Sequence, residues 1–204
     1  MTESDRITVV LLAGGPATRL PGKLALDVDG EPMLARVYRQ LTSTGWPCVI
    51  SARAQLGTRM PGNAPYQVAL DDVADGGPLV GLRTAAALVR TPLLFAAAAD
   101  LPNLSIAFAA RLLAAYDAAG SRAPHAVLPT WPDGKVEPLA AVYDAAAYAR
   151  GAVAALAAGR RKVTAALDGL EILAYPVRPE DEEVLLNVNT PQDYERLRAS
   201  GLRS

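Results

Sequence analysis

The chain contains few of the residues on which several common classes of protein depend. Its one cysteine, Cys48, excludes an internal disulfide framework and a cysteine-based zinc cluster. Its one histidine, His125, excludes a metal site built from several histidines. Cys48 lies in an apolar run, so we expect an inert, buried thiol there, and we expect His125 in an exposed loop before a strand.

The chain also lacks a long apolar run and an excess of one charge. Its longest wholly apolar runs, at 93–99 and 152–158, are far shorter than the roughly 20 residues that a membrane span needs. No basic segment precedes an apolar run at the N-terminus, as it would in a signal peptide. Lys and Arg number 20 and Asp and Glu 21, so the composition shows no basic footprint for nucleic acid. We expect a cytoplasmic globular protein that binds neither membrane nor nucleic acid.

The order of apolar runs predicts the fold class. In the first half, short continuous apolar runs, typical of strands buried on both faces, alternate with segments of helical periodicity. The expected strands are 7–12, 48–51, 67–70 and 93–98, and the expected helices are 32–44, 78–89 and 105–119. This alternation favours an α/β fold: a doubly wound, mostly parallel sheet with helices on both faces, of the Rossmann-like kind.

The second half is less regular and predicts a smaller, irregular β part. Strands are expected at 126–130 and 138–143 around a hairpin turn at 132–135, and again at 171–177 and 184–188. A helix at 145–158 ends at Gly159. Thr190, Pro191 and Asp193 announce a last helix, with a hydroxyl cap, a proline in the first turn and an acid after it. No linker separates two domains, so residues 1–204 are expected to form one domain.

The loop after the first strand is the strongest candidate for a binding site. It carries Gly14, Gly15, Arg19 and Lys23 before the first helix. Ligands of open parallel sheets bind at the carboxyl ends of the strands; adjacent glycines let backbone amides approach a phosphate, and the two cations can bind the same anion. The loop matches neither the dinucleotide-binding nor the P-loop motif. The alternative is a tight turn with two surface cations.

Three acidic or amide residues elsewhere are further candidates. Asp100 follows the buried strand at 93–99, at the edge where the glycine loop is expected, and a carboxylate there can hold Mg²⁺ against a triphosphate; a turn or cap aspartate is the alternative. Asn187 and Asn189 alternate on an expected strand, so their side chains should point to opposite faces. One of the two would face a substrate, with ordinary turn chemistry as the alternative.

Six segments together resemble a known family across nearly the whole chain. Leu12-Ala13-Gly14-Gly15, with Arg19 and Lys23, resembles the signature loop of nucleotidyltransferases that activate small phosphorylated substrates. The whole ordered set resembles the molybdenum cofactor guanylyltransferases; the later segments are Asp71, 77–82, 100–102, 137–143 and 187–191.

The resemblance implies transfer of GMP from GTP to the terminal phosphate of molybdopterin, with release of pyrophosphate. It implies a nucleotide-binding half at about 1–122 and a substrate-binding half at about 123–204, and transient contact with molybdopterin-supplying or molybdoenzyme proteins. The implied catalytic residues are Arg19, Lys23 and Asp100, with Mg²⁺ on Asp100. The implied nucleotide-binding residues are Leu12, Ala13, Gly14, Gly15, Lys23, Asp71 and Asp100, and Asn187 and Asn189 are implied to bind the pterin substrate.

Two departures from the family pattern keep other functions open. The stretch between Arg19 and Lys23 is one residue shorter than usual, and Arg53 stands where the family commonly has an asparagine after the second strand. A sibling enzyme that uses CTP or acts on a sugar phosphate is one alternative. A non-catalytic module that carries molybdopterin or nucleotide is the other.

Overall fold

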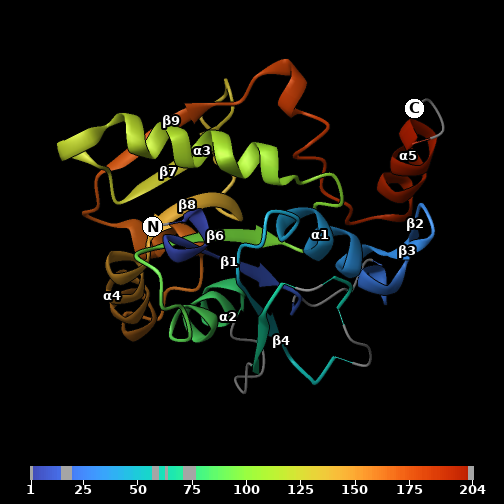
Figure 1. Ribbon diagram of the computed structural model, residues 1–204, viewed down its shortest axis with the longest axis horizontal. Helices are drawn as coiled ribbons and strands as arrows, with labels where there is room; N and C mark the ends of the chain where they lie inside the picture. The colour runs from blue at the N-terminus through green and yellow to red at the C-terminus, as the bar shows by residue number, and fades with distance from the viewer. Residues whose placement is uncertain (1, 15–19, 57–59, 63, 71–76, 202–204) are drawn as a thin grey trace.

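A seven-stranded sheet runs through the centre of the protein, with helices against both of its faces (Figure 1). The computed structural model describes residues 2–14, 20–56, 60–62, 64–70 and 77–201. The spatial order of the strands is β5-β4-β1-β6-β8-β7-β9, and β8 alone among these seven runs antiparallel to its neighbours. The strands are β1 (Ile7–Leu12), β4 (Cys48–Ala52), β5 (Tyr66–Leu70), β6 (Leu93–Ala98), β7 (Ala126–Thr130), β8 (Ala140–Asp144) and β9 (Ile172–Pro176). The predicted doubly wound, mostly parallel sheet is confirmed, and β7 to β9 extend it.

The helices divide between the two faces of the sheet. One face is covered by α1 (Met33–Leu41) and α3 (Ile106–Ala118), and the other by α2 (Gly77–Ala86) and α4 (Ala145–Ala157) (Figure 1). The last helix, α5 (Pro191–Gly201), lies at one end of the molecule near a small hairpin of strands β2 (Asp27–Val28) and β3 (Glu31–Pro32). Short 3₁₀ helices are η1 (Glu3–Asp5), η2 (Lys23–Ala25), η3 (Gly120–Arg122), η4 (Val163–Leu167) and η5 (Pro179–Asp181).

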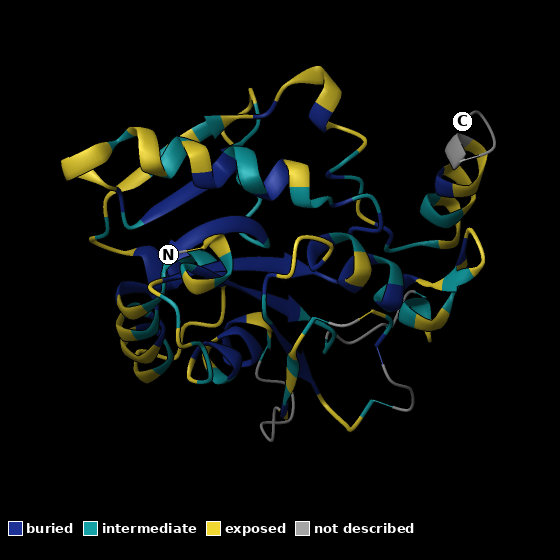
Figure 2. Ribbon diagram, viewed as in Figure 1, coloured by how far each residue is buried: buried dark blue, intermediate teal, exposed yellow. Residues whose placement is uncertain are grey.

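Burial on both faces explains why the central strands read as continuous apolar runs. Every residue of β6 is buried, and β1 is buried up to its last residue, as Figure 2 shows in dark blue. Val9 and Leu11 pack with α1 and α3, whereas Val10 packs with α2 on the other face. A strand with a core on each side favours apolar side chains on both faces, so its sequence shows no alternation. The one polar side chain of β1, Thr8, is buried, and its hydroxyl forms a hydrogen bond with the Thr91 hydroxyl at 2.8 Å.

The starts of the helices expected at 105 and 191 are also found, whereas α1 and α2 each end three residues before the expected bounds of 44 and 89. Ser105 Oγ accepts a hydrogen bond from the amide of Phe108 at the start of α3, at 3.3 Å. At the start of α5, Thr190 Oγ1 accepts from the Asp193 amide while the Asp193 carboxylate accepts from the Thr190 amide, at 3.2 and 2.8 Å. This reciprocal pair forms the capping arrangement that the sequence predicted.

The expected strand at 184–188 is wrong. This segment is irregular, and turn-type hydrogen bonds join the Leu185 amide to the carbonyl of Asp181. Its apolar side chains serve two separate clusters: Leu185 packs beneath α3, whereas Val188 packs with Val28, Met33 and Leu197 beside α1 and α5. The apolar pattern therefore arises from a loop that bridges two hydrophobic clusters.

A small hairpin was missed by the sequence analysis. Strands β2 (Asp27–Val28) and β3 (Glu31–Pro32) are joined by Asp29 and Gly30, whose φ angles are 54° and 88°. Positive φ at both central residues is the requirement of the tight hairpin turn for which Asp-Gly is a preferred sequence. The dipeptide was a usable signal. The hydroxyl of Tyr194 in α5 donates to the Asp27 carbonyl at 2.5 Å, so the hairpin supports the last helix.

One buried carboxylate fixes the chain between β9 and the last helix. Asp181 is fully buried; it accepts hydrogen bonds from the Arg111 guanidinium on α3 and, at 3.1 Å, from the Arg178 amide. Because an unpaired buried charge is costly, these two donors determine where the segment before Asn187 can lie.

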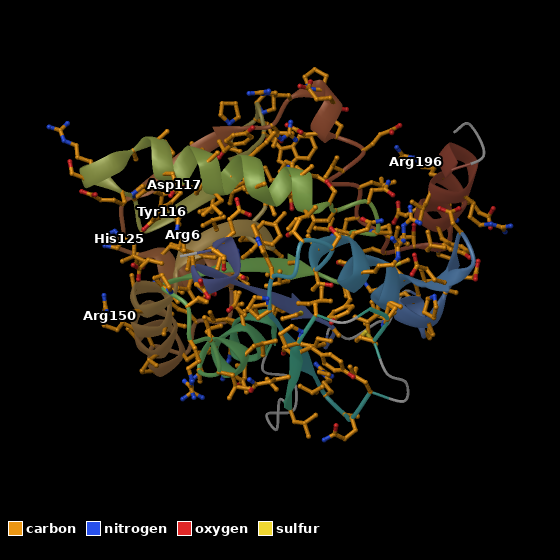
Figure 3. All side chains as sticks on the ribbon, in the orientation of Figure 1. Arg6, Tyr116, Asp117, His125, Arg150 and Arg196 are labelled. Carbon is orange, nitrogen blue, oxygen red and sulfur yellow. The ribbon has the colours of Figure 1, made fainter. Side chains whose placement is uncertain are left out.

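We expect Asp181→Asn to lower the free energy of unfolding by about 2 kcal/mol, because a charge-assisted hydrogen bond in a buried site is lost. Chemical denaturation monitored by circular dichroism would measure the change. The control is Asp117→Asn, since Asp117 pairs with Arg6 at the exposed end of α3 (Figure 3). A surface pair contributes about 0–1 kcal/mol. Equal losses in the two variants would contradict the prediction.

Candidate active site

A cavity of about 510 Å³ opens at the edge where β1, β4 and β6 end. This edge is the expected ligand-binding position in an open parallel sheet, and the volume lies in the usual range for small-molecule sites. The described lining residues come from the ends of these strands, from η2, from the start of α2 and from the second half of the chain. They are Leu12, Ala13, Gly14, Gly22, Lys23, Leu24, Ala25, Ser51, Arg53, Gly77, Pro78, Gly81, Ala98, Asp100, Leu139 and Asn189.

Lys23 reaches into the cavity from the short helix η2. Gly22, which precedes it, has φ 69°, a left-handed conformation that a residue with a Cβ atom rarely adopts. The Lys23 ammonium donates to Asp100 Oδ2 at 2.5 Å and to Asn189 Oδ1 at 2.8 Å. Only 12% of the Lys23 side chain and 19% of the Asp100 side chain are exposed. The ion pair is therefore largely shielded from bulk water, and salt weakens it less than it would an exposed pair.

Asp100 and Asn189 meet because the backbone joins their two segments. Asp100 follows β6 in a turn that its neighbour Leu101 closes with a hydrogen bond to the Ala98 carbonyl. The amide of Val188 donates to the Asp100 carbonyl at 2.9 Å. This bond carries the loop before α5 to the end of β6 and brings Asn189 over the Asp100 carboxylate.

The expectation that Asn187 and Asn189 point to opposite faces is wrong. Because 184–188 is not a strand, the two side chains do not alternate, and Asn189 Nδ2 donates to Asn187 Oδ1 at 2.9 Å. Asn189 lines the cavity, whereas Asn187 is exposed, is not among the lining residues and contacts Asn189. Their contact with a pterin stays a prediction.

The cavity brings together most of the predicted site residues that the structure describes. Those that line it are Leu12, Ala13, Gly14, Lys23, Asp100 and Asn189. Gly15, Arg19 and Asp71 lie outside the described residues. The functional roles of all these residues stay predictions, but their shared location is a structural fact.

The cavity also contains residues to which the sequence analysis gave no firm role. Ser51 and Arg53 come from the end of β4, and Arg53 Cγ lies 3.6 Å from the position that a Cβ atom on Gly14 would occupy. A signal existed, because residues just after a strand of a parallel sheet face its binding edge. Gly77 and Pro78 place the start of α2 in the wall, and the carbonyl oxygen of Arg161 lies 3.6 Å from where a Gly77 Cβ would be.

The donor set around the Lys23 ammonium suits a hard divalent cation. A carboxylate oxygen of Asp100 and an amide oxygen of Asn189 both lie within 2.8 Å of one positively charged nitrogen. Mg²⁺ prefers one or two carboxylates with further oxygens supplied by substrate phosphates. Among the described residues, no three or more His, Cys, Asp or Glu side chains gather as metal ligands, so an all-protein cage is absent from this part of the chain.

Cys48, Tyr143 and His125 are not among the described lining residues of the cavity. Cys48 is buried in β4, and burial raises the pKa of its thiol well above the ordinary value, so the thiol stays protonated. Tyr143 is buried, and its hydroxyl donates to the Pro138 carbonyl at 2.6 Å. His125 accepts a hydrogen bond from the Glu171 amide at 3.1 Å. Across the described residues, no helix is long and apolar enough to cross a membrane.

Comparison with known proteins agrees with the geometry of the cavity. A probable molybdenum cofactor guanylyltransferase of Natronomonas pharaonis is 30% identical, over 94% of this chain and 96% of its own. A molybdenum cofactor guanylyltransferase of Burkholderia vietnamiensis is 34% identical, over 92% of this chain and 93% of its own.

Two solved structures show how widely the fold is shared. Molybdopterin-guanine dinucleotide biosynthesis protein A from Archaeoglobus fulgidus has a TM-score of 0.78 at 23% identity and covers 97% of this chain and 100% of its own. The 4-diphosphocytidyl-2C-methyl-D-erythritol synthase of Anaerococcus prevotii reaches 0.72 at 10% identity, covering 98% of this chain and 100% of its own. The profile of the MobA-like NTP transferase domain matches residues 9–172, and the chain belongs to this family of nucleotidyltransferases.

Proposed function

We propose that the protein transfers GMP from GTP to the terminal phosphate of molybdopterin and releases pyrophosphate, forming molybdopterin guanine dinucleotide. The observation that carries the proposal is the single cavity in which Gly14, Lys23 and Asp100 meet, in a chain whose relatives are named molybdenum cofactor guanylyltransferases. If these three residues lay on unconnected surfaces, they could not bind the same triphosphate.

The protein groups at the cavity act by holding the triphosphate. The backbone at Gly14 and the Lys23 ammonium face the cavity, and the positive end of the α2 dipole lies in its wall at Gly77 and Pro78. Gly15 and Arg19 are proposed to add an amide and a guanidinium to the same phosphates. These donors favour an in-line geometry in which pyrophosphate leaves opposite the attacking oxygen.

We propose Asp100, with Asn189 beside it, as the residues that would hold Mg²⁺. The ion, when bound, offsets negative charge on the transferring and leaving phosphate oxygens. The acceptor phosphate is already largely ionised near pH 7, since the second pKa of a phosphate monoester is about 6. The reaction therefore needs no protein base to create its nucleophile.

The acceptor is proposed to approach from the second half of the chain. Leu139 and Asn189 are the described lining residues of the cavity that belong to 123–204, and the other described ones belong to 1–122. This lining supports the proposed division into a nucleotide-binding half at about 1–122 and a substrate-binding half at about 123–204. We also propose that the protein works in the cytoplasm and makes transient contacts with molybdopterin-supplying or molybdoenzyme proteins.

The nucleotide base is the part of the substrate for which GTP and CTP differ. We propose that Asp71 accepts hydrogen bonds from the N–H groups of guanine, which cytosine does not present in the same arrangement. GTP is therefore expected to bind at least about tenfold more tightly than CTP. Cytosine would leave the Asp71 carboxylate without its hydrogen-bond donors. Competition titration of the two nucleotides against the wild-type chain in Mg²⁺ would measure the ratio. A preference for CTP would favour the cytidylyl alternative.

Pyrophosphate release tests catalysis itself. The wild-type chain is incubated with GTP, Mg²⁺ and molybdopterin, and pyrophosphate and the dinucleotide product are quantified. Stoichiometric appearance of both supports guanylyl transfer. Tight binding of GTP and molybdopterin with no pyrophosphate would instead identify a carrier module, and release with a sugar phosphate alone would identify a sibling enzyme.

A further inference from the structure

The Lys23 ammonium occupies a position that is chemically suited to a metal ion. It is bonded to two oxygen atoms, Asp100 Oδ2 at 2.5 Å and Asn189 Oδ1 at 2.8 Å, and both belong to the residues proposed above to hold the divalent cation. An ammonium donor and a metal ion seek the same lone pairs. An ammonium and a divalent cation at the same two oxygens repel each other, so each weakens the binding of the other.

The orientation of Asn189 is fixed by its neighbours. An amide presents either its oxygen or its NH₂ group, and only the oxygen attracts a cation. Asn189 Nδ2 donates to Asn187 Oδ1 at 2.9 Å, and the Asn189 backbone amide donates to the Asp193 carboxylate at 3.0 Å. The NH₂ group is thereby used on the Asn187 side, so the oxygen is directed at Lys23. Asn187 is a positioning residue for this oxygen.

We propose that Lys23 serves as an internal counterion that fills the divalent-cation position until nucleotide arrives, so that metal and nucleotide load together. This inference rests on the proposed function. With no nucleotide, a divalent cation must displace a largely buried ammonium from Asp100 and Asn189. With a triphosphate in the cavity, the ammonium gains phosphate oxygens as partners and leaves both residues to the metal ion.

The two lysine states also differ in the charge of the cavity. Among the described lining residues, Asp100 is the one acidic side chain, while Lys23 and Arg53 are basic. While Lys23 neutralises Asp100, the described part of the lining holds no uncompensated buried carboxylate. After the ammonium moves to a phosphate, the carboxylate regains a cation partner in the metal ion. Each state of the cavity therefore keeps its acidic group paired.

Direct metal binding without nucleotide tests the exchange. The probe is Mn²⁺, titrated into the full chain and followed by its electron paramagnetic resonance signal. Lys23→Met is expected to bind Mn²⁺ at least tenfold more tightly than wild type, because the competing ammonium is gone. Adding Asp100→Asn to Lys23→Met is expected to remove this gain. Lys23→Gln provides a second substitution in case the methionine variant does not fold, as judged by circular dichroism.

The matched control is Lys135→Met. Lys135 forms an ion pair with Glu137 at 3.0 Å, and neither residue is among the described lining residues. The substitution therefore removes a lysine from a carboxylate outside the lining, while Glu137 keeps its hydrogen bond from the Trp131 indole at 2.9 Å. Its Mn²⁺ affinity is expected to equal that of wild type. A further readout concerns Asn187: in the Lys23→Met background, Asn187→Leu should reduce the Mn²⁺ affinity, whereas Asn187→Asp, which keeps the acceptor oxygen, should restore it.

The outcomes separate this inference from the proposed function. Equal Mn²⁺ affinity in wild type and both Lys23 variants overturns the exchange, even if GMP transfer proceeds normally. A similar gain in Lys135→Met also overturns it, since removal of a lysine from any carboxylate would then suffice. If the Lys23 variants bind Mn²⁺ more tightly but the wild-type chain transfers no GMP, the exchange between Lys23 and the metal ion is supported and the guanylyltransferase function is contradicted.

Discussion

Asp100→Ala is expected to reduce the rate of GMP transfer by about 10²- to 10³-fold, and Lys23→Ala by a similar factor. Each side chain supplies charge at a position where the transferring phosphate would lie. Steady-state pyrophosphate release from GTP and molybdopterin, with saturating Mg²⁺, would measure kcat and KM for each variant.

The two losses should not add. The Lys23 ammonium and the Asp100 carboxylate contact each other at 2.5 Å, so each variant also disturbs the partner that remains. We expect the double variant to be little worse than the poorer single variant. Independent, fully additive losses would mean that the two residues act on separate substrates or separate steps.

The control for these variants is an ion pair of the same type elsewhere. Asp117→Ala breaks the ion pair that Asp117, near the end of α3, makes with Arg6, which precedes β1. Both residues are labelled in Figure 3. It should leave kcat and KM unchanged within about twofold, because a rim or surface charge far from the site contributes little. Near-normal turnover in both Asp100→Ala and Lys23→Ala would show that the assigned cavity is not where the chemistry occurs.

Sequence patterns predicted the parts of this molecule in which local and tertiary preferences agree. The strands at 7–12 and 93–98 were found with their bounds intact, because a strand buried on both faces is mostly apolar along its whole length. The end of the 93–98 strand then placed Asp100 at the ligand-binding edge. This much follows from one rule about parallel sheets.

The parts that sequence could not predict depend on contacts between distant segments. The 184–188 segment is apolar, yet its side chains are shared between two hydrophobic clusters. Lys23 and Asn189 are 166 residues apart, and their hydrogen bond depends on the Val188 amide finding the Asp100 carbonyl. A single sequence contains no local signal for such a contact. The pairing of the cation position with an internal ammonium is visible only after the fold is assembled.

Gly151→Ala is expected to destabilise the protein, although glycine-to-alanine changes inside helices usually stabilise by roughly 1 kcal/mol. Gly151 lies in α4, where the helix passes against the backbone of η4. A Cβ atom on residue 151 would lie 1.9 Å from the carbonyl oxygen of Ala166 and 2.9 Å from its carbonyl carbon. These are backbone atoms, so no side-chain rotation can relieve the overlap.

Relief requires α4 and η4 to separate, which loosens the buried side chains between them, among them Val163, Ala166 and Leu167. Overpacking of this kind costs about 1–3 kcal/mol and occasionally more. We expect a net loss of about 3 kcal/mol, since the overlap is with fixed backbone. For a chain of this size, that lowers the melting temperature by roughly 6–12 °C.

The control for Gly151→Ala is Val153→Ala on the same helix, where the side chain is 54% exposed. Its stability should change by no more than about 0.5 kcal/mol, because an exposed helix position has no packing to lose. Differential scanning calorimetry would compare the two variants. A raised melting temperature in Gly151→Ala would mean that α4 and η4 do not lie in contact at this point. The expected fall would instead show that close backbone approach outweighs helix propensity here, and would fix α4 beside the loop that carries Arg161 to the Gly77 wall of the cavity.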